Sequence, residues 1–445
     1  KQFTTDNGND DHQRAVHSVK YSQSKPFTCT VCPKRFTTDK DLKHHMKNAS
    51  KRHKKMTVVT YQKLKTIKYS KTVSRKSEIF DRACSSEEVN ILIHDELQPD
   101  EGFHGLYEKA IDSLKKKLEK VLLDTFYGIH SFIEAESIAK GTALKNHSDL
   151  NCVMITTNIK DASQLKAELP NVLRDLKKRL GSSIGVKWKL TLKEKTPFSL
   201  VFNMSRHSNP KDTITVAVLP TFEANIEGNN DMYLFKRKGE TFYKEMLSDT
   251  KENWPYYSAA LVKIQRDFVK KRPASVKYLI RMVKYWCKKY IPLSGSKRLP
   301  PSYLLELLTI HAWKNANPLN PPESFDMKIG FKAVMEVLKN HQSLRVSWED
   351  YYRRDLIPIS RFLHSRRHRR LGSIAQIFFH YGILFMAYFL FWHFSLLNEA
   401  YIIDPANPTN NLYASVDCWD EVKKVAEETM RKPLLRDVWV TFNWG

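Results

Sequence analysis

The sequence predicts an α+β protein: a small Cys/His module, then a lobe built on a mixed β-sheet, then a helical C-terminal lobe. Three observations predict this order. A Cys-x2-Cys pair followed by histidines lies near the N-terminus. Stretches with strand-like alternation gather between residues 150 and 220, and helical spacing of apolar residues dominates from about residue 256 onward.

The composition is that of a globular protein with a strong positive charge. Of the 445 residues, 42% are hydrophobic and 11% aromatic, which argues against wholesale disorder and against a multi-span membrane protein. Lysine and arginine number 73 against 48 acidic residues, a formal net charge of +25. Such an excess favours a polyanionic partner, nucleic acid first. Sparse cysteines and the absence of a short apolar stretch near the first residue favour a reducing compartment, with the cytoplasm expected and the nucleus as the alternative.

The Cys/His module has the spacing of a metal-stabilised finger. Cys29 and Cys32 are followed after twelve residues by His45, and His53 is the next histidine in line. A segment this short cannot bury enough surface to fold alone, so a tetrahedral Zn²⁺ would supply the missing stability. The module resembles a Cys2His2 zinc finger, although seven residues rather than three to five separate the two histidines. An incomplete site, or unrelated cysteines and histidines, are the alternatives.

A basic stretch separates this module from the rest of the chain. Positive charges recur between Lys51 and Lys76 with few large apolar residues, which favours phosphate attraction, nuclear import or a merely solvated linker. A helix is predicted from Gly102, because leucines and isoleucine recur between Leu106 and Leu122 at three- to five-residue steps. Lysines at 115–120 cover another face of this helix.

The strand-like stretches predict a mixed sheet. They are residues 150–156, 186–190, 199–203 and 214–219. The last of them is expected to end at Pro220. Helical patterns at 275–290 and 303–316 then predict the helical lobe.

The chain is expected to divide into five parts. We expect a flexible tail at 1–24, the finger at 25–55, a basic linker at 56–95, an α/β lobe with central helices at 96–290, and a helical C-terminal lobe at 291–445.

A polar turn precedes the first long strand and suggests a site. The turn runs from Ser137 through Lys140, and the strand begins near Asp149. Since residues two apart on a strand point to the same face, Asp149 and Asn151 aim together at whatever lies above the turn. This arrangement is typical of a metal site.

Four blocks in order resemble the 2′-5′-oligoadenylate synthase family. They are Ala135–Asn151, Gln265–Trp286, Leu299–Thr309 and Asp404–Asn411. The likeness runs from about Glu96 to Val438. It implies a nucleotidyltransferase-like fold, ATP and Mg²⁺ as ligands, double-stranded RNA as partner, and an antiviral, innate-immune setting.

The resemblance also implies a degenerate catalytic centre. In the family, two divalent cations are held by three carboxylates; here the first position is Asp149, the second is Asn151, and the third, directly before Val-Leu-Pro, is Ala217. One acid among three positions predicts weak magnesium binding and an inactive or severely weakened enzyme. Glu136 is the better substitute among nearby acids, but it would repel phosphate. A strand-end cap is the plainer interpretation of Asp149.

Residues that bind nucleotide and RNA follow from the same resemblance. Those matching donor-nucleotide contacts are Ser137, Lys140, Arg281, Lys284 and Tyr303. Ser302 replaces a glutamine of the family, which weakens the case for adenine recognition. Arg266 and Lys270, four apart and hence on one helix face, match positions that touch duplex RNA, and together with the 115–120 lysines they predict a basic rail for duplex RNA. Solvated helix faces are the plain alternative for these cations.

An apolar insert at 366–397 interrupts the likeness. Arginines precede an uncharged run from Ile374 to Leu397, long enough to span a bilayer. A span would place Asp404–Gly445 across the membrane from its own core. Three interpretations stay open: a non-native insertion such as retained intron sequence, an added packed or membrane-surface helix, and a true span. A membrane partner is not expected, and no protein partner is defined.

The sequence therefore predicts a double-stranded-RNA-binding, oligoadenylate-synthase-like protein with Zn²⁺ in its finger and little or no catalysis. An active, RNA-stimulated synthase that joins ATP into 2′-5′-linked oligoadenylates is the alternative. A DNA-binding regulator that uses the finger is a third class, weakened by the short site that one finger reads.

Overall fold

The computed structural model describes the chain mainly from residue 79 onward. The described residues are 27–28, 35–36, 40, 44, 79–135, 137–145, 149–185, 187–209, 213–224, 226, 241–292, 297–348, 351–352, 400–441 and 444. The chain divides into two compact units, Lys1–Ser77 and Glu78–Gly445.

In the first unit, the description covers a short antiparallel pair. Strand β1 (Phe27–Thr28) pairs with β2 (Arg35–Phe36). The zinc ligands expected from the sequence, Cys29, Cys32, His45 and His53, lie outside the described residues, as does the apolar insert at 366–397. The zinc finger and the nature of the insert therefore stay predictions.

The second unit contains the mixed sheet that the sequence predicts. Its strands, in spatial order, are β3 (Ser131–Glu134), β4 (Asp149–Ile155), β8 (Thr213–Thr221), β7 (Leu200–Arg206), β6 (Trp188–Lys195) and β5 (Ser183–Ile184). Strands β4 and β8 run parallel, and all other neighbours run antiparallel. The α+β class is confirmed by this sheet and the helices around it.

Strand β8 extends past the proline at which it was expected to end. Pro220 is buried and lies opposite Met154 of β4. On the other side, the pairing with β7 stops at Val218, so no β7 residue needs the N–H that proline lacks. The strand can therefore continue to Thr221.

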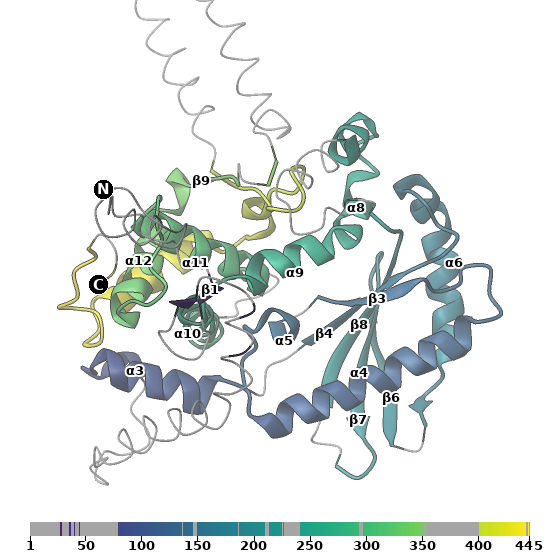
Figure 1. Ribbon diagram of the computed structural model, residues 1–445, viewed down its shortest axis with the longest axis horizontal. Helices are drawn as coiled ribbons and strands as arrows, with labels where there is room; N and C mark the ends of the chain where they lie inside the picture. Colours follow the sequence, from purple (N-terminus) through teal and green to yellow (C-terminus); the bar gives the residue numbers. More distant parts are fainter. Residues whose placement is uncertain are drawn as a thin grey trace, which may run out of the picture. The chain divides into compact units, whose positions relative to one another are not determined.

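Two helices cover one face of the sheet, and the site described below involves residues of the opposite face. They are α4 (Glu101–Leu122), as the sequence predicts, and α6 (Ala162–Leu180). Apolar side chains of both helices pack with alternate residues of the strands, such as Val216 and Val218 of β8, in one buried cluster. The intervening β8 residues, Thr215 and Ala217 among them, are only partly buried. Figure 1 shows the sheet (blue to teal) with α4 crossing it.

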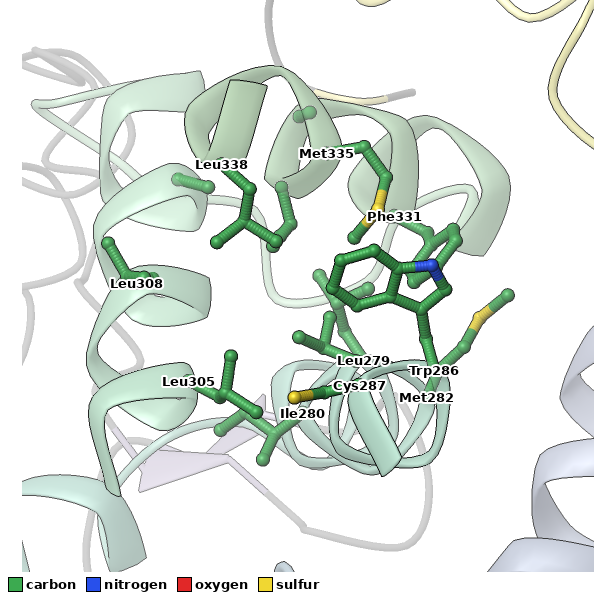
Figure 2. Packing of buried hydrophobic residues seen from close by; sticks show 14 of the residues in the cluster. Leu279, Ile280, Met282, Trp286, Cys287, Leu305, Leu308, Phe331, Met335 and Leu338 are labelled. Atoms are coloured by element: carbon green, nitrogen blue, oxygen red, sulfur yellow. The ribbon is translucent and has the colours of Figure 1, made fainter. Parts of the chain in front are cut away.

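The helical part of this unit has its own core. Its main helices are α9 (Val262–Lys270), α10 (Ala274–Tyr290), α11 (Ser302–Ala316), α12 (Met327–Lys339) and α15 (Trp419–Met430). Helix α8 (Trp254–Ala260) precedes them and buries its side chains in the cluster of the sheet. The helices predicted at 275–290 and 303–316 are confirmed as α10 and α11. Figure 2 shows how α10, α11 and α12 converge, with the indole of Trp286 lying between Leu279 and Met335. Its Nε1 donates to Thr429 Oγ1 of α15 at 2.8 Å.

Residues 79–97 add helices to this core. They form η1 (Ile79–Asp81), α3 (Ser86–Leu92) and η2 (Ile93–Leu97). Ser85 caps α3 in a reciprocal capping box with Glu88. Phe80 and Val89 are fully buried in the same cluster as Trp286. The part of the expected linker from residue 79 to 95 is thus packed helix in this structure.

Within the described residues, no helix has both the length and the apolar character needed to cross a membrane.

Candidate functional site

The three backbone positions that the resemblance assigns to metal-binding acids meet on adjacent strands. Asp149 and Asn151 lie two apart on β4, and Ala217 lies opposite Asn151 on β8. Thr215 stands opposite Asp149 in the same register. Asn151, Thr215 and Ala217 are each partly buried, on the face of the sheet that α4 and α6 leave free. The parallel pairing therefore brings all three positions to one place.

These residues do not fit a two-magnesium centre. Mg²⁺ prefers carboxylate oxygens and near-octahedral geometry, and two such ions need several negative ligands between them. Here an amide and a methyl group, Asn151 and Ala217, face each other across the strand pair. The nearby hydroxyl of Thr215 donates to Asn203 Oδ1 at 3.4 Å instead. Among the described residues, no group of three or more His, Cys, Asp or Glu side chains is placed to hold a metal ion.

A buried carboxylate occupies the centre of the expected phosphate-binding cations. We call Glu306, Lys140, Thr142 and Lys284 the Glu306 cluster. Glu306 Oε1 accepts from Lys284 Nζ at 2.5 Å and from Thr142 Oγ1 at 2.6 Å, and Oε2 accepts from Lys140 Nζ at 3.1 Å. Lys284 Nζ also donates to Ser137 Oγ at 3.3 Å. Three of the residues expected at the nucleotide, Ser137, Lys140 and Lys284, are thus bound to Glu306 directly or through Lys284, and Glu306 was not among the predicted site residues.

The two lysines of the Glu306 cluster favour the ionised form of the Glu306 carboxyl group. Burial alone raises the pKa of Glu306, but the ammonium groups of Lys140 and Lys284 outweigh burial and bring the pKa down to about 2. Only 1% of Glu306 is exposed. At neutral pH one carboxylate therefore faces two ammonium groups in a buried setting.

Arg281 is held differently from the two lysines. Its Nε donates to the carbonyl of Ala143 at 3.0 Å and its Nη2 to that of Gly141 at 2.8 Å. The guanidinium lies 5.6 Å from the ring centroid of Tyr278. Burial lowers the pKa of Arg281 to about 10. The guanidinium thus contacts two carbonyls and a ring. Unlike Lys140 and Lys284, it has no carboxylate within 4 Å among the described side chains.

Tyr303 is fixed by a second buried acid. Its Oη donates to Asp404 Oδ1 at 3.0 Å, and Lys140 Nζ lies 4.6 Å from its ring centroid. Asp404 also accepts from Gln265 Nε2 at 2.6 Å and from Asn410 Nδ2 at 3.2 Å. Burial raises the pKa of Asp404, and its hydrogen bonds only partly offset this effect. The Lys140 ammonium thus already covers the ring of Tyr303.

A cavity of about 590 Å³ opens beside the β4–β8 positions. Asn151 and Leu219 line it from the sheet, and Trp254 and Tyr256 line it from α8. Further lining residues include Gln265, Asn407, Thr409 and Asn410. The aromatic residues that α8 contributes to this cavity were not predicted as part of a site, because its tryptophan and tyrosines match ordinary core spacing.

The residues expected at duplex RNA lie on two separate helices. Arg266 and Lys270 are on α9, which packs against α5 (Ser137–Lys140) and α8, whereas α4 with its lysines packs on the sheet. Arg266 Nε pairs with Asp267 at 2.9 Å, and Lys115 pairs with Glu134 at 2.7 Å. Lys270 is exposed and belongs to no ion pair among the described residues. The rail expected from the sequence is therefore partly neutralised at Arg266 and Lys115.

Comparison with known families identifies one match. Residues 236–371 match the family model described as 2′-5′-oligoadenylate synthetase 1, domain 2, C-terminus. This segment contains α8 to α12, and therefore Arg281, Lys284 and Glu306.

Comparison with individual proteins points the same way. The chain is 26% identical over 357 residues to mouse 2′-5′-oligoadenylate synthase 2, covering 78% of this chain and 43% of that protein. It is 28% identical to bovine 2′-5′-oligoadenylate synthase 2, of which it covers 45%. Against rat 2′-5′-oligoadenylate synthase 1A it is 26% identical, covering 74% of this chain and 85% of that protein. The chain thus spans less than half the length of the first two relatives. Together with the family model, these matches support the 2′-5′-oligoadenylate synthase family.

Solved structures give more distant likenesses. E. coli MS115-1 CdnC with ATP is 17% identical with a TM-score of 0.44, covering 78% of this chain and 89% of that chain. The Cid1 poly(U) polymerase is 12% identical with a TM-score of 0.40, covering 78% and 92%.

Proposed function

We propose that this chain binds double-stranded RNA and does not join nucleotides efficiently. The premise is membership of the oligoadenylate synthase family, which these matches support. Its setting would be antiviral defence, by the same resemblance. The proposal also takes the large unit to be a nucleotidyltransferase-like domain, and the N-terminal Cys/His segment to be a zinc finger held by Cys29, Cys32, His45 and His53.

One observation carries the catalytic half of the proposal. Asn151 and Ala217 are paired neighbours on β4 and β8, at the point where metal-assisted phosphoryl transfer would need negatively charged ligands. An amide oxygen is a neutral ligand and a methyl group is none. The repulsion between a nucleotide triphosphate and an attacking hydroxyl would then lack its usual divalent counter-charge.

Nucleotide binding without turnover would meet two obstacles in this site. Lys140 and Lys284 donate to Glu306, so an incoming triphosphate must compete with a buried carboxylate for both ammonium groups. The ring of Tyr303 is covered by Lys140 and its hydroxyl is bound to Asp404. Both features oppose the nucleotide contacts that the resemblance assigns to these residues.

The RNA half of the proposal rests on charge and spacing. The chain carries a formal net charge of +25, and Lys270 presents an exposed ammonium group on the same helix as Arg266. Duplex RNA is read mostly through its phosphates and 2′-hydroxyls, which need cations and hydrogen-bond donors rather than base-specific pockets.

An RNA-binding titration tests this part. We expect Arg266→Glu with Lys270→Glu to weaken binding of a labelled duplex RNA at least about tenfold, and binding by the unaltered chain to fall steeply with salt. Lys193→Glu with Lys195→Glu is the matched control, since both lysines are exposed on β6 and carry the same charge. If both double variants weaken RNA binding equally, the loss is due to net charge alone, and a site on α9 is refuted.

An enzyme assay tests the catalytic part. The purified chain is incubated with ATP, Mg²⁺ and duplex RNA, and 2′-5′-linked products are separated. We expect little or no product. Formation of oligoadenylates that disappears with Asp149→Ala would overturn the proposal in favour of an active synthase.

A further inference from the structure

The cavity beside strands β4 and β8 has a lining that is mostly apolar and almost without charge. Its volume of about 590 Å³ lies within the range of about 300–1,000 Å³ that is usual for small-molecule sites. Apolar side chains reach it from the sheet, from α6 and from α8, for example Leu219, Leu169 and Trp254. Among the described residues of the lining, Lys251 carries the only charge. The cavity therefore favours a neutral molecule with an apolar body.

The cations that the resemblance assigns to nucleotide phosphates do not line this cavity. Lys140 and Lys284 are bound to Glu306, and Arg281 is bound to two backbone carbonyls. None of these three cations belongs to the described lining. Asn151, which stands at a position expected for a metal ligand, contributes a neutral amide to the lining. A triphosphate placed in the cavity would thus lack counter-charges.

Two aromatic rings lie at the opening of the cavity. Phe198, in the turn between β6 and β7, lines the cavity and is also 36% exposed. Its ring meets that of Tyr256 on α8 edge to face, with 5.2 Å between the centroids and 69° between the planes. Such a pair offers an entering ring both an aromatic face and an aromatic edge to pack against.

A buried acid orients two amide groups of the lining. Asp404 Oδ2 accepts from Gln265 Nε2 at 2.6 Å and from Asn410 Nδ2 at 3.2 Å, and both amides line the cavity. Because each amide nitrogen faces Asp404, each amide oxygen is directed elsewhere. Within the described residues, neither oxygen accepts a hydrogen bond, and neither is sealed from solvent. The cavity thus presents two fixed acceptor oxygens in an otherwise apolar setting.

We propose that this cavity binds an uncharged, phenol-like aromatic molecule. The apolar walls and the rings of Phe198 and Tyr256 enclose its ring, and the amide oxygens of Gln265 and Asn410 accept from its hydroxyl group. A nucleoside fits less well, because its ring nitrogens and ribose hydroxyls need donors in a lining that is mostly apolar. The inference goes beyond the proposed function, since the cavity requires neither RNA nor phosphate.

Binding of 2-naphthol to the full chain tests the site. This probe is a neutral two-ring phenol at pH 7, and its affinity is measured by equilibrium dialysis. 2-Methoxynaphthalene has the same rings but no donor, so it leaves the amide oxygens unpaired and should bind about tenfold more weakly. Adenosine is measured in the same way and should bind more weakly than 2-naphthol.

Two variants place the probe in the cavity. Ala259→Phe puts a ring inside the cavity without removing a side-chain hydrogen bond, so the affinity for 2-naphthol should fall at least about tenfold. Ala274→Phe, the same change at the exposed start of α10, is the matched control and should leave the affinity unchanged. Phe198→Ala keeps the test decisive if Ala259→Phe folds poorly, because Phe198 is exposed; it should weaken binding about threefold.

The remaining outcomes would overturn the inference. They are no binding of 2-naphthol, an equal loss in Ala274→Phe, no loss in either cavity variant, equal affinity for the two naphthalenes, or tighter binding of adenosine. Failure of the unaltered chain to bind duplex RNA would count against the proposed function alone, because the dialysis contains no RNA.

Discussion

Replacing Glu306 by glutamine should destabilise the helical lobe, because it leaves two buried ammonium groups without a counter-ion. Glu306 is 1% exposed, and its two oxygens accept from Lys140, Thr142 and Lys284. Glutamine keeps the shape and one acceptor oxygen, but it removes the charge. The change therefore isolates the electrostatic part of the cluster.

The size of the effect follows from the pKa of the carboxyl group. It is about 2 in the folded protein against an ordinary value of 4.5. At 1.36 kcal/mol for each unit of pKa, this difference corresponds to about 3 kcal/mol of folding stability at neutral pH. Breaking a buried ion pair by removing one partner typically costs about 3–5 kcal/mol, which agrees. We expect the free energy of unfolding of Glu306→Gln to be lower by about 3 kcal/mol at pH 7.

The same reasoning fixes the pH dependence. Since the folded pKa lies below the unfolded one, the contribution is fully present above pH 4.5 and is lost as the pH falls towards 2. Urea denaturation followed by tryptophan fluorescence should show a gap between Glu306→Gln and the unaltered chain at pH 7 that narrows below pH 4.5. Glu428→Gln, an exposed change on α15, should show no such gap.

A second variant keeps the test decisive if Glu306→Gln folds poorly. Adding Lys284→Met removes one of the stranded cations, so the double variant should recover part of the lost stability. Equal stability of Glu306→Gln and the unaltered chain at pH 7, or a gap that does not change with pH, would refute this account of the cluster.

Two further predictions concern metals. Asn151→Asp with Ala217→Asp should raise Mn²⁺ affinity at least about tenfold, because the double change places two more acids beside Asp149. Calorimetry measures the affinity, and Asn151→Ser with Ala217→Ser is the neutral control. No gain in affinity would mean that the missing acids do not limit Mn²⁺ binding. Cys29→Ser should abolish stoichiometric zinc binding by the purified full chain, as measured by elemental analysis. Cys84→Ser, at a partly buried cysteine elsewhere in the chain, should leave the zinc content unchanged. Full zinc retention in Cys29→Ser would count against the finger.

Periodicity sufficed for much of the fold. The apolar repeat from Leu106 to Leu122 predicted α4, and the patterns at 275–290 and 303–316 predicted α10 and α11, because each of these helices buries one face or nearly its whole surface. The packed segment at 79–97 was missed, since it follows a long run of charge and its helices are short. Its capping box at Ser85 and Glu88 was a signal that the sequence offered.

The site was harder to predict because its decisive contact spans the chain. Lys140 and Glu306 are 166 residues apart in sequence, so no local pattern relates them. A lone acid within the leucine-rich helix α11 was nonetheless informative, because a buried carboxylate requires cationic or hydrogen-bonding partners. The cations were identified by resemblance, and their partner came only from the fold. The resemblance therefore identified the lysines but did not predict that Glu306 neutralises their charge.

The positions that the resemblance assigns to metal ligands and the cations that it assigns to phosphate contacts lie on different elements of this fold, so a change at one set need not disturb the other. The positions that would hold metal ions are on strands β4 and β8, whereas the cations are mostly on helices α9 and α10. Substituting Asn151 and Ala217 on the strands leaves the helix charges in place. A site that lacks divalent ions has all the more need of those charges to attract phosphate, since no metal shares the task. Under the proposed function, helices α9 and α10 would therefore keep their charge for phosphate although strands β4 and β8 carry Asn151 and Ala217 in place of acids.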